Sequence, residues 1–203
     1  CRVNLLGVLM IADQNLITKK ALEHGMKLLN MAQSDFAAGK KEIALAEFQT
    51  MPMPKEKDED WRYTEIGKLK LEKFEPFESD AKISVSELPE SLAEQGVILT
   101  DINTALDRYP AAQNYFFKRA KTGKDKFVAL NAAYFSNGIF LYVPKNVELK
   151  EPIRARFELE GNGVLHNLII IESNSQLDFV EEYSGLSDAE QINSAVTEVF
   201  ANT

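Results

Sequence analysis

The chain has 203 residues, of which 45% are apolar and 27% are charged, so it can bury a sizeable core as one domain or one domain with an appendage. Its formal charge of −8 excludes the nonspecific electrostatic attraction that nucleic acids and anionic membranes exert. Cys1 is the only cysteine, which excludes an internal disulfide or a thiolate cage for zinc or a cluster and indicates a reducing, cytoplasmic setting.

The first segment combines an apolar run with an amphipathic helix. Residues 3–12 are apolar but too short to span a bilayer, and no small-X-small cleavage pattern follows them. A lipid-modified Cys1 would need an exported context, so a fragment boundary or a start at Met10 is the simpler interpretation. From Leu16 to Gln33 the apolar residues recur at helical spacing and predict a helix, although the sequence gives residues 1–33 no role.

Short helices are predicted for the next hundred residues. One runs from about Lys40 to Thr50 and is stopped by the prolines of the MPMP sequence, after which KEKDEDWRYTEIG is expected to be extended. Residues 87–119 predict short helices punctuated by Gly96 and Pro110, and residues 125–135 predict one more.

Beyond Asn137 the sequence predicts β-structure. The apolar runs IFLYV, IRARFEL, LHNLIII and LDFV are separated by turns rich in Asn, Gly and Ser, and IRARFEL alternates as a half-buried strand does. A β-solenoid and a β-sandwich both fit this pattern, and parallel or antiparallel strands would separate them. We therefore expect a mainly helical domain over residues 1–136 and a β-domain over residues 137–203.

Three motifs suggest phosphate or calcium binding but lack the required residues. Gly161-X-Gly163 is followed by a strand where a dinucleotide site needs a helix, so it predicts a turn. Thr122-Gly123-Lys124 lacks the first glycine and the Ser or Thr of a phosphate loop, so it predicts a surface turn. The acidic run Glu56, Asp58, Glu59 and Asp60 lacks the spacing of a calcium loop and predicts a solvated segment.

The histidines do not form a recognisable site. His24 lies on the predicted first helix, and His166 lies in a strand in phase with Val164 and Leu168, so we expect a hydrogen-bonded or partly buried side chain; any further role of His166 is open. The sequence therefore predicts no catalytic, cofactor-binding or metal-binding residue and no enzyme activity.

Three segments resemble the SufB/SufD family of iron-sulfur cluster assembly scaffold proteins. KDEDWRYTEI at 57–66 is similar to the acidic stretch with Trp-Arg/Lys-Tyr/Thr that follows a proline helix stop in the family. ALNAAYFSNGIFLYVPKNVELKEPI at 129–153 resembles the step from a helix into the first coil of a right-handed parallel β-helix. NLIIIESNSQLDFVEEYSG at 167–185 is similar to an early coil.

The resemblance implies an α+β fold and a non-catalytic scaffold subunit that pairs with a SufB/SufD-like chain and a SufC-like ABC ATPase during cluster assembly. Family members continue through more coils into a helical segment that binds the ATPase, so we expect this chain to be a truncated N-terminal part, or to self-associate through an uncapped edge. We expect it to bind no cluster alone, since the family's cluster residues lie in the later coils. Trp61 would be a packing anchor, and a SufB-like or SufD-like identity is left open.

Two alternatives remain. A carbohydrate-acting β-helix enzyme would need clustered acids, and Asp178, Glu181 and Glu182 are better interpreted as a polar outer face. A small all-β binding module would use a pocket without catalytic groups.

Overall fold

A computed structural model describes residues 35–75, 77 and 81–202, and the predicted helix of residues 16–33, Cys1 and His24 lie outside these ranges. The helices of the described residues are α3 (Asp35–Thr50), α4 (Glu90–Glu94), α5 (Ile102–Arg108), α6 (Pro110–Tyr115) and α7 (Lys126–Tyr134). Short 3-10 turns are η2 (Glu59–Trp61), η3 (Ile66–Lys68), η4 (Leu71–Phe74) and η5 (Thr122–Lys124).

Local sequence explains where the main helices begin and end. The Asp125 carboxylate accepts the backbone N–H groups of Phe127 and Val128 and so caps α7, as the sequence predicts for a helix over 125–135. Helix α3 ends at Thr50, immediately before the MPMP stop, which confirms the prediction for its C-terminus. The N-terminus of α3 lies at Asp35, a few residues earlier than predicted.

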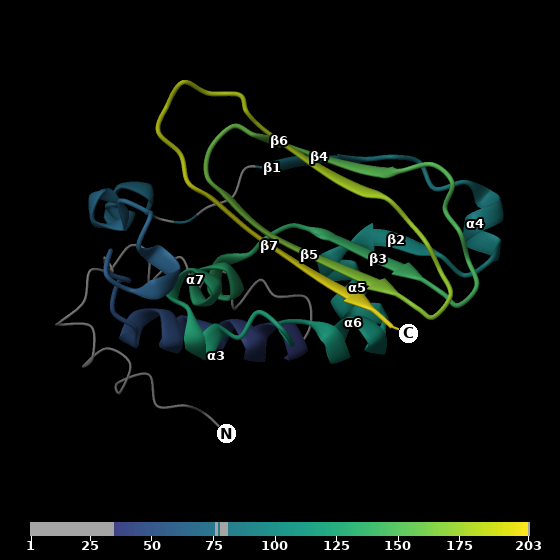
Figure 1. Ribbon diagram of the computed structural model, residues 1–203, viewed down its shortest axis with the longest axis horizontal. Helices are drawn as coiled ribbons and strands as arrows, with labels where there is room; N and C mark the ends of the chain where they lie inside the picture. The colour runs from purple at the N-terminus through teal and green to yellow at the C-terminus, as the bar shows by residue number, and fades with distance from the viewer. Residues whose placement is uncertain (1–34, 76, 78–80, 203) are drawn as a thin grey trace.

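Within the described residues, seven strands form two sheets, which lie one above the other in Figure 1. The first sheet has the order β1-β4-β6 and the second the order β2-β3-β5-β7. Their bounds are β1 (Ala81–Val85), β2 (Ile98–Asp101), β3 (Ile139–Val143), β4 (Ile153–Leu159), β5 (Gly163–Ile171), β6 (Phe179–Gly185) and β7 (Asn193–Ala201).

The strands after residue 137 pair in parallel at a nearly constant sequence spacing. Phe140 pairs with Leu168 in β3 and β5, Ile153 with Phe179 in β4 and β6, and Gly163 with Asn193 in β5 and β7. The pairings β1–β4 and β2–β3 are antiparallel. Each of these three pairs joins strands that run in the same direction and lie 26 to 30 residues apart in the sequence. An antiparallel sandwich does not show this arrangement.

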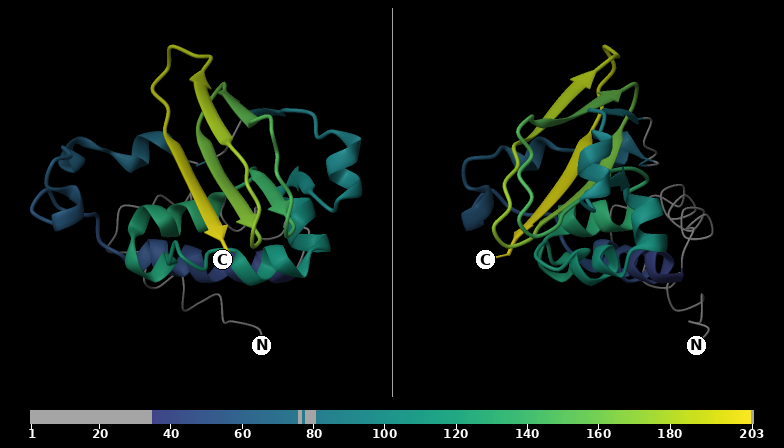
Figure 2. Two further views of the ribbon diagram at one scale, coloured as in Figure 1. Left: turned by 45° about the vertical axis from the view of Figure 1, so that its right-hand side comes forward. Right: turned by 90° about the vertical axis from the view of Figure 1, so that its right-hand side faces the viewer.

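Helices α3, α5, α6 and α7 cover one face of the four-stranded sheet, and the three-stranded sheet lies on its other face, with α4 beside the two sheets (Figures 1 and 2). Strand β5 shows the alternation directly, because Val164, Leu168 and Ile170 join the core with the helices while Leu165 and Ile169 join the cores between the sheets. The predicted alternation of IRARFEL is confirmed, since the apolar residues of β4 are buried and its arginines are exposed. The described fold is therefore mixed α/β, and an all-β module does not account for it.

Several local predictions were wrong. Residues 87–119 contain strand β2 between α4 and α5, because Val97 is buried and Ile98 pairs with Tyr142 of β3. The segment expected to be extended at 55–67 contains the 3-10 turns η2 and η3. Strands β1 and β7 were not predicted. The division at residue 136 stays a prediction, although β1 and β2 lie before it and pair with strands that follow it.

Candidate functional site

His166 and Glu198 form a buried polar pair between the helices and the second sheet. His166 is fully buried on β5, where its ring packs against Phe116 and Phe117 at centroid distances of 4.5 and 4.2 Å. Glu198 reaches it from the neighbouring strand β7, with Oε2 3.4 Å from His166 Nε2. The distance of 3.4 Å suits an electrostatic contact and is long for a hydrogen bond. The sequence predicted a hydrogen-bonded or partly buried histidine, and the structure shows a fully buried one.

The Glu198 carboxylate holds the loop that follows α6. Its oxygens accept the backbone N–H groups of Phe117 at 2.6 Å, Arg119 at 2.7 Å and Ala120 at 3.0 Å. Phe117 has a φ of 49°, a left-handed conformation that a bulky residue rarely adopts. The three N–H groups form an anion-binding concavity, and the chain fills it with its own carboxylate.

The pKa values of the pair keep the carboxylate charged. Burial opposes ionisation of Glu198, but His166 and the N–H groups of Ala120 and Arg119 outweigh it and lower the pKa of Glu198. Burial lowers the pKa of His166, against the opposing effect of Glu198, so the imidazole is neutral near pH 7. A neutral, solvent-inaccessible histidine suits packing and not proton exchange with a substrate.

A second polar network joins the two sheets. Asn167 on β5 accepts the N–H of Ile139 and donates to Glu181 on β6, and Thr197 on β7 donates to the same Glu181 oxygen at 2.7 Å. The Tyr183 hydroxyl donates to the other Glu181 oxygen at 2.9 Å. Glu181 therefore bridges the sheets, which corrects the prediction that it lies on a polar outer face. Glu182 does lie outside, where it pairs with Arg156 at 3.2 Å.

Two buried lysines join α3 and α7 reciprocally. Lys41 of α3 donates to the carbonyl of Phe135, the C-terminal cap of α7, at 2.6 Å. Lys126, the first residue of α7, donates to the carbonyls of Phe48 and Met51 at the end of α3, both at 2.6 Å. Burial lowers the pKa of each lysine to about 8. Each ammonium satisfies carbonyls that the end of the other helix leaves free and lies where the helix dipole favours a cation.

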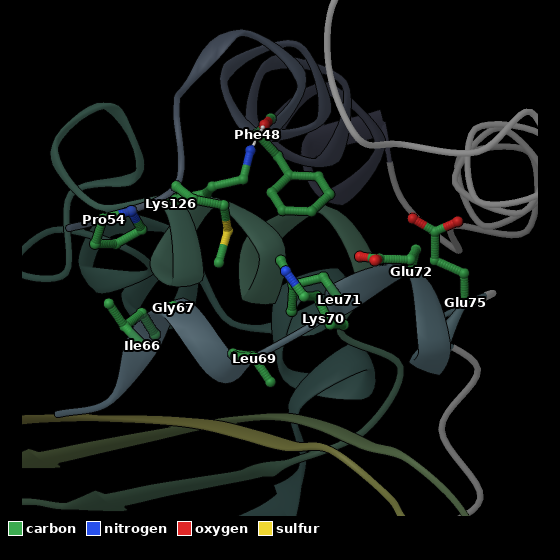
Figure 3. A pocket seen from close by; sticks show the side chains of 11 residues that line it. Phe48, Pro54, Ile66, Gly67, Leu69, Lys70, Leu71, Glu72, Glu75 and Lys126 are labelled. Carbon is green, nitrogen blue, oxygen red and sulfur yellow. Dashed lines mark hydrogen bonds between the residues drawn. The ribbon is translucent and has the colours of Figure 1, made fainter. Parts of the chain in front are cut away.

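Lys126 also lines a pocket of about 190 Å³ between the end of α3 and the turns η3 and η4 (Figure 3). Figure 3 shows the Lys126 amine directed at the Phe48 carbonyl, with Glu72 and Glu75 at the opposite end of the pocket. Its lining contains apolar side chains, lysines and glutamates but no Ser, Thr, Cys or His. The lysine holds the helix, and these lining residues do not provide a hydroxyl, thiol or imidazole nucleophile.

The two predicted turns are confirmed. Thr122–Lys124 is the 3-10 turn η5, followed directly by the Asp125 cap of α7. Gly161 and Gly163 flank the bend between β4 and β5, where Asn162 donates to the Phe74 carbonyl and accepts the Ile192 N–H. That asparagine fixes the bend by bonding to two other segments of the same chain.

The acidic run and Trp61 have separate environments. Glu56, Asp58, Glu59 and Asp60 are all exposed, as predicted. Trp61 is half-buried and packs on Phe127 of α7 at a centroid distance of 5.0 Å, which agrees with a packing role.

Some buried polar residues gave no recognisable signal in the sequence. Glu198 lies 32 positions from His166 within an unremarkable polar stretch, and Lys41 and Lys126 look like ordinary surface lysines of amphipathic helices. Within the described ranges, no group of three or more His, Cys, Asp or Glu side chains could hold a metal ion. No helix in that part of the chain is long and apolar enough to cross a membrane.

Comparison with known proteins gives one family. Residues 77–155 match the family model described as the SufBD protein N-terminal region. This range contains the segment 129–153, so the resemblance noted from the sequence is confirmed there, whereas the segments 57–66 and 167–185 lie outside it.

Individual relatives carry the same family name. The chain is 36% identical over 118 residues to the iron-sulfur cluster assembly protein SufD of Bacillus subtilis, an alignment that covers 55% of this chain and 27% of the relative. It is 29% identical over 128 residues to an iron-sulfur cluster assembly SufBD family protein of Staphylococcus epidermidis, covering 61% of this chain and 28% of the relative. The chain thus spans little more than a quarter of the length of these relatives.

Proposed function

Because residues 77–155 of this chain match the family model of the SufBD protein N-terminal region, we propose that the chain works as a non-catalytic scaffold in iron-sulfur cluster assembly. The observation that carries the proposal is the continuation of that region into strands that pair in parallel at nearly constant spacing. A scaffold needs a rigid surface more than a reactive group, and stacked strands provide one.

We propose that the parallel strands are the first coils of a β-helix. The turns stack as the strands do, since Asn146 and Asn174 both have left-handed backbones, with φ of 62° and 58°, and are joined by a side-chain hydrogen bond of 2.7 Å. Glu148 and Gln176 form a parallel bridge just beyond them. Aligned asparagines in successive turns support a repeating coil, in which each turn contacts the next.

The polar groups support a structural role. Glu198, Lys41 and Lys126 each bond to backbone groups of the same chain, so their charges are already committed. Glu181 bridges the sheets and Glu182 pairs with Arg156, so these acids do not converge as a glycosidase pair would. We propose that the chain alone neither turns over ATP nor holds a cluster.

We propose a cytoplasmic role in which the chain acts with a SufB/SufD-like scaffold chain and a SufC-like ABC ATPase, the ATP hydrolysis belonging to the ATPase. The test is co-expression of the tagged chain with both candidate partners, followed by purification under anaerobic conditions. Retention of at least one partner through size-exclusion chromatography supports the proposal. Stoichiometric iron and sulfide on the isolated chain, or ATP turnover abolished by a point substitution, would contradict the non-catalytic, cluster-free assignment.

A further inference from the structure

A groove of about 440 Å³ between α3, α7 and the loop after α6 is lined by four lysines. Lys40 comes from α3, Lys118 and Lys121 from the loop, and Lys124 from η5, and all four are exposed. The groove also contains Ile43, a residue that is 60% exposed. A concentrated basic and apolar surface is notable on a chain whose formal charge is −8.

The four ammonium groups are available to a partner. None of them pairs with a carboxylate among the described residues; Lys40 and Lys118 lie over the rings of Phe36 and Tyr115, at 5.7 and 4.9 Å. The backbone that carries the loop lysines is fixed, because Glu198 holds the N–H groups of the preceding residues. A fixed backbone reduces the entropy lost when a partner binds.

The groove suits an acidic protein segment better than a phosphate. A phosphate cradle uses convergent backbone N–H groups, whereas those of Phe117, Arg119 and Ala120 are occupied by Glu198, and that of Lys124 bonds to the Lys121 carbonyl. Ile43 adds an apolar contact that a phosphate or a nucleic-acid backbone would not use. Residues 1–34 are a poor charge match for the groove, since they contain four basic and two acidic residues.

We propose that this groove, the lysine groove, docks an acidic segment of a partner protein that places carboxylates against the lysines and an apolar side chain on Ile43. The inference does not depend on the role in cluster assembly. It assigns the chain a contact surface on its helical layer, on the side of the four-stranded sheet opposite the three-stranded sheet.

The test is fluorescence anisotropy of the whole chain with a labelled peptide that repeats Glu and Leu at helical spacing. A matched peptide with Gln in place of Glu is the negative probe. The double variant K121E/K124E should weaken binding of the Glu peptide about tenfold, because two attractions become repulsions. Ile43→Ser, which keeps the charge, should weaken it about fivefold through lost apolar contact.

The matched control is K145E/K150E, which makes the same change in net charge at exposed lysines in the turn region between β3 and β4. It should leave the affinity within about twofold of the unsubstituted chain. Equal weakening by both double variants would overturn the proposal, since the effect would then be one of overall charge. Binding of the Gln peptide with equal affinity, or tighter binding of tripolyphosphate or single-stranded DNA that depends on Lys121 and Lys124, would also overturn it.

Discussion

Glu198 and Phe117 lie 81 positions apart in the sequence, and the Glu198 Oε2 atom accepts the Phe117 backbone N–H at 2.6 Å. Phe117 adopts its left-handed backbone at this contact. An ordinary residue in that conformation costs on the order of 1 kcal/mol or more, so the surrounding contacts must stabilise it. The carboxylate on β7 thereby fixes a loop that the helices alone do not hold.

The Glu198→Gln variant should lower the free energy of unfolding by about 2–3 kcal/mol, measured by urea denaturation at pH 7. Glutamine is similar in shape, but its amide presents an NH₂ group where the carboxylate accepts backbone N–H donors. Glu151→Gln, at an exposed position, is the control and should change the value by less than about 0.5 kcal/mol. Equal effects of the two substitutions would contradict the role assigned to Glu198.

Acidification should destabilise the chain through His166. The pKa of this imidazole is lowered in the folded state below the value of 6.5 that applies on unfolding. Below pH 6.5 the unfolded state therefore binds the proton that the folded state does not, and stability falls as pH falls. When the pH falls from 7.5 to 5.5, the free energy of unfolding should fall by up to about 1 kcal/mol more in the unsubstituted chain than in the His166→Leu variant. Parallel stability profiles for the two proteins would show that His166 does not titrate in this way.

Gly138→Ala should be among the most destabilising single substitutions. A Cβ at this position would lie 1.7 Å from the His166 carbonyl oxygen, and the Gly138 φ of 152° is also unfavourable for alanine. Because the clash is with backbone and not with a flexible side chain, we expect the free energy of unfolding to fall by about 3–5 kcal/mol in thermal or urea denaturation.

Gly39→Ala is the matched control on α3, since nothing lies within 4 Å of its added Cβ. It should stabilise the chain by about 0.5–1 kcal/mol, because glycine is unfavourable inside a helix. A stabilised Gly138→Ala protein, or one merely as stable as the unsubstituted chain, would show that the close approach to His166 relaxes freely.

Raising the pH should increase the free energy of unfolding through Lys41. The pKa of Lys41 is lowered to about 8 from an ordinary value of 10.5, so between these values the unfolded state binds more protons than the folded state. Stability then rises with pH. From pH 7 to 9.5 the free energy of unfolding should rise by about 1 kcal/mol more in the unsubstituted chain than in Lys41→Met. The expected rise is kept this small because deprotonation also loses the hydrogen bond that the ammonium donates to the Phe135 carbonyl. A relative loss over the same range would mean that this bond dominates burial.

The parts of the fold that the sequence predicted have local causes. Pro52 and Pro54 cannot continue a helix and end α3, and Asp125 accepts the free N–H groups that begin α7. Strand β4 alternates because one face is buried between the sheets and the other is exposed. Such signals depend on a few neighbouring residues, so one sequence is enough to show them.

The missed parts depend on partners distant in the chain. Strand β2 has only four residues and is defined by its pairing with β3. Strand β7 pairs with β5, but many of its residues are polar or exposed, so the sequence lacks an apolar run there. Glu198 is buried because three backbone N–H groups and His166 lie next to it, none of which is near it in sequence. Tertiary contacts override local preference at these positions, and pattern and propensity do not reveal them.

The paired strands are separated by very different lengths of chain, which matters during synthesis. Ala81 of β1 pairs with Leu159, whereas the parallel partners of β4 and β5 lie only 26 to 30 positions further along the chain. As the chain leaves the ribosome, β1 emerges early yet lacks its hydrogen-bonding partner strand until β4 has also emerged. During the interval between the emergence of β1 and β4, the backbone N–H and C=O groups of β1 are therefore open to pairing with other chains.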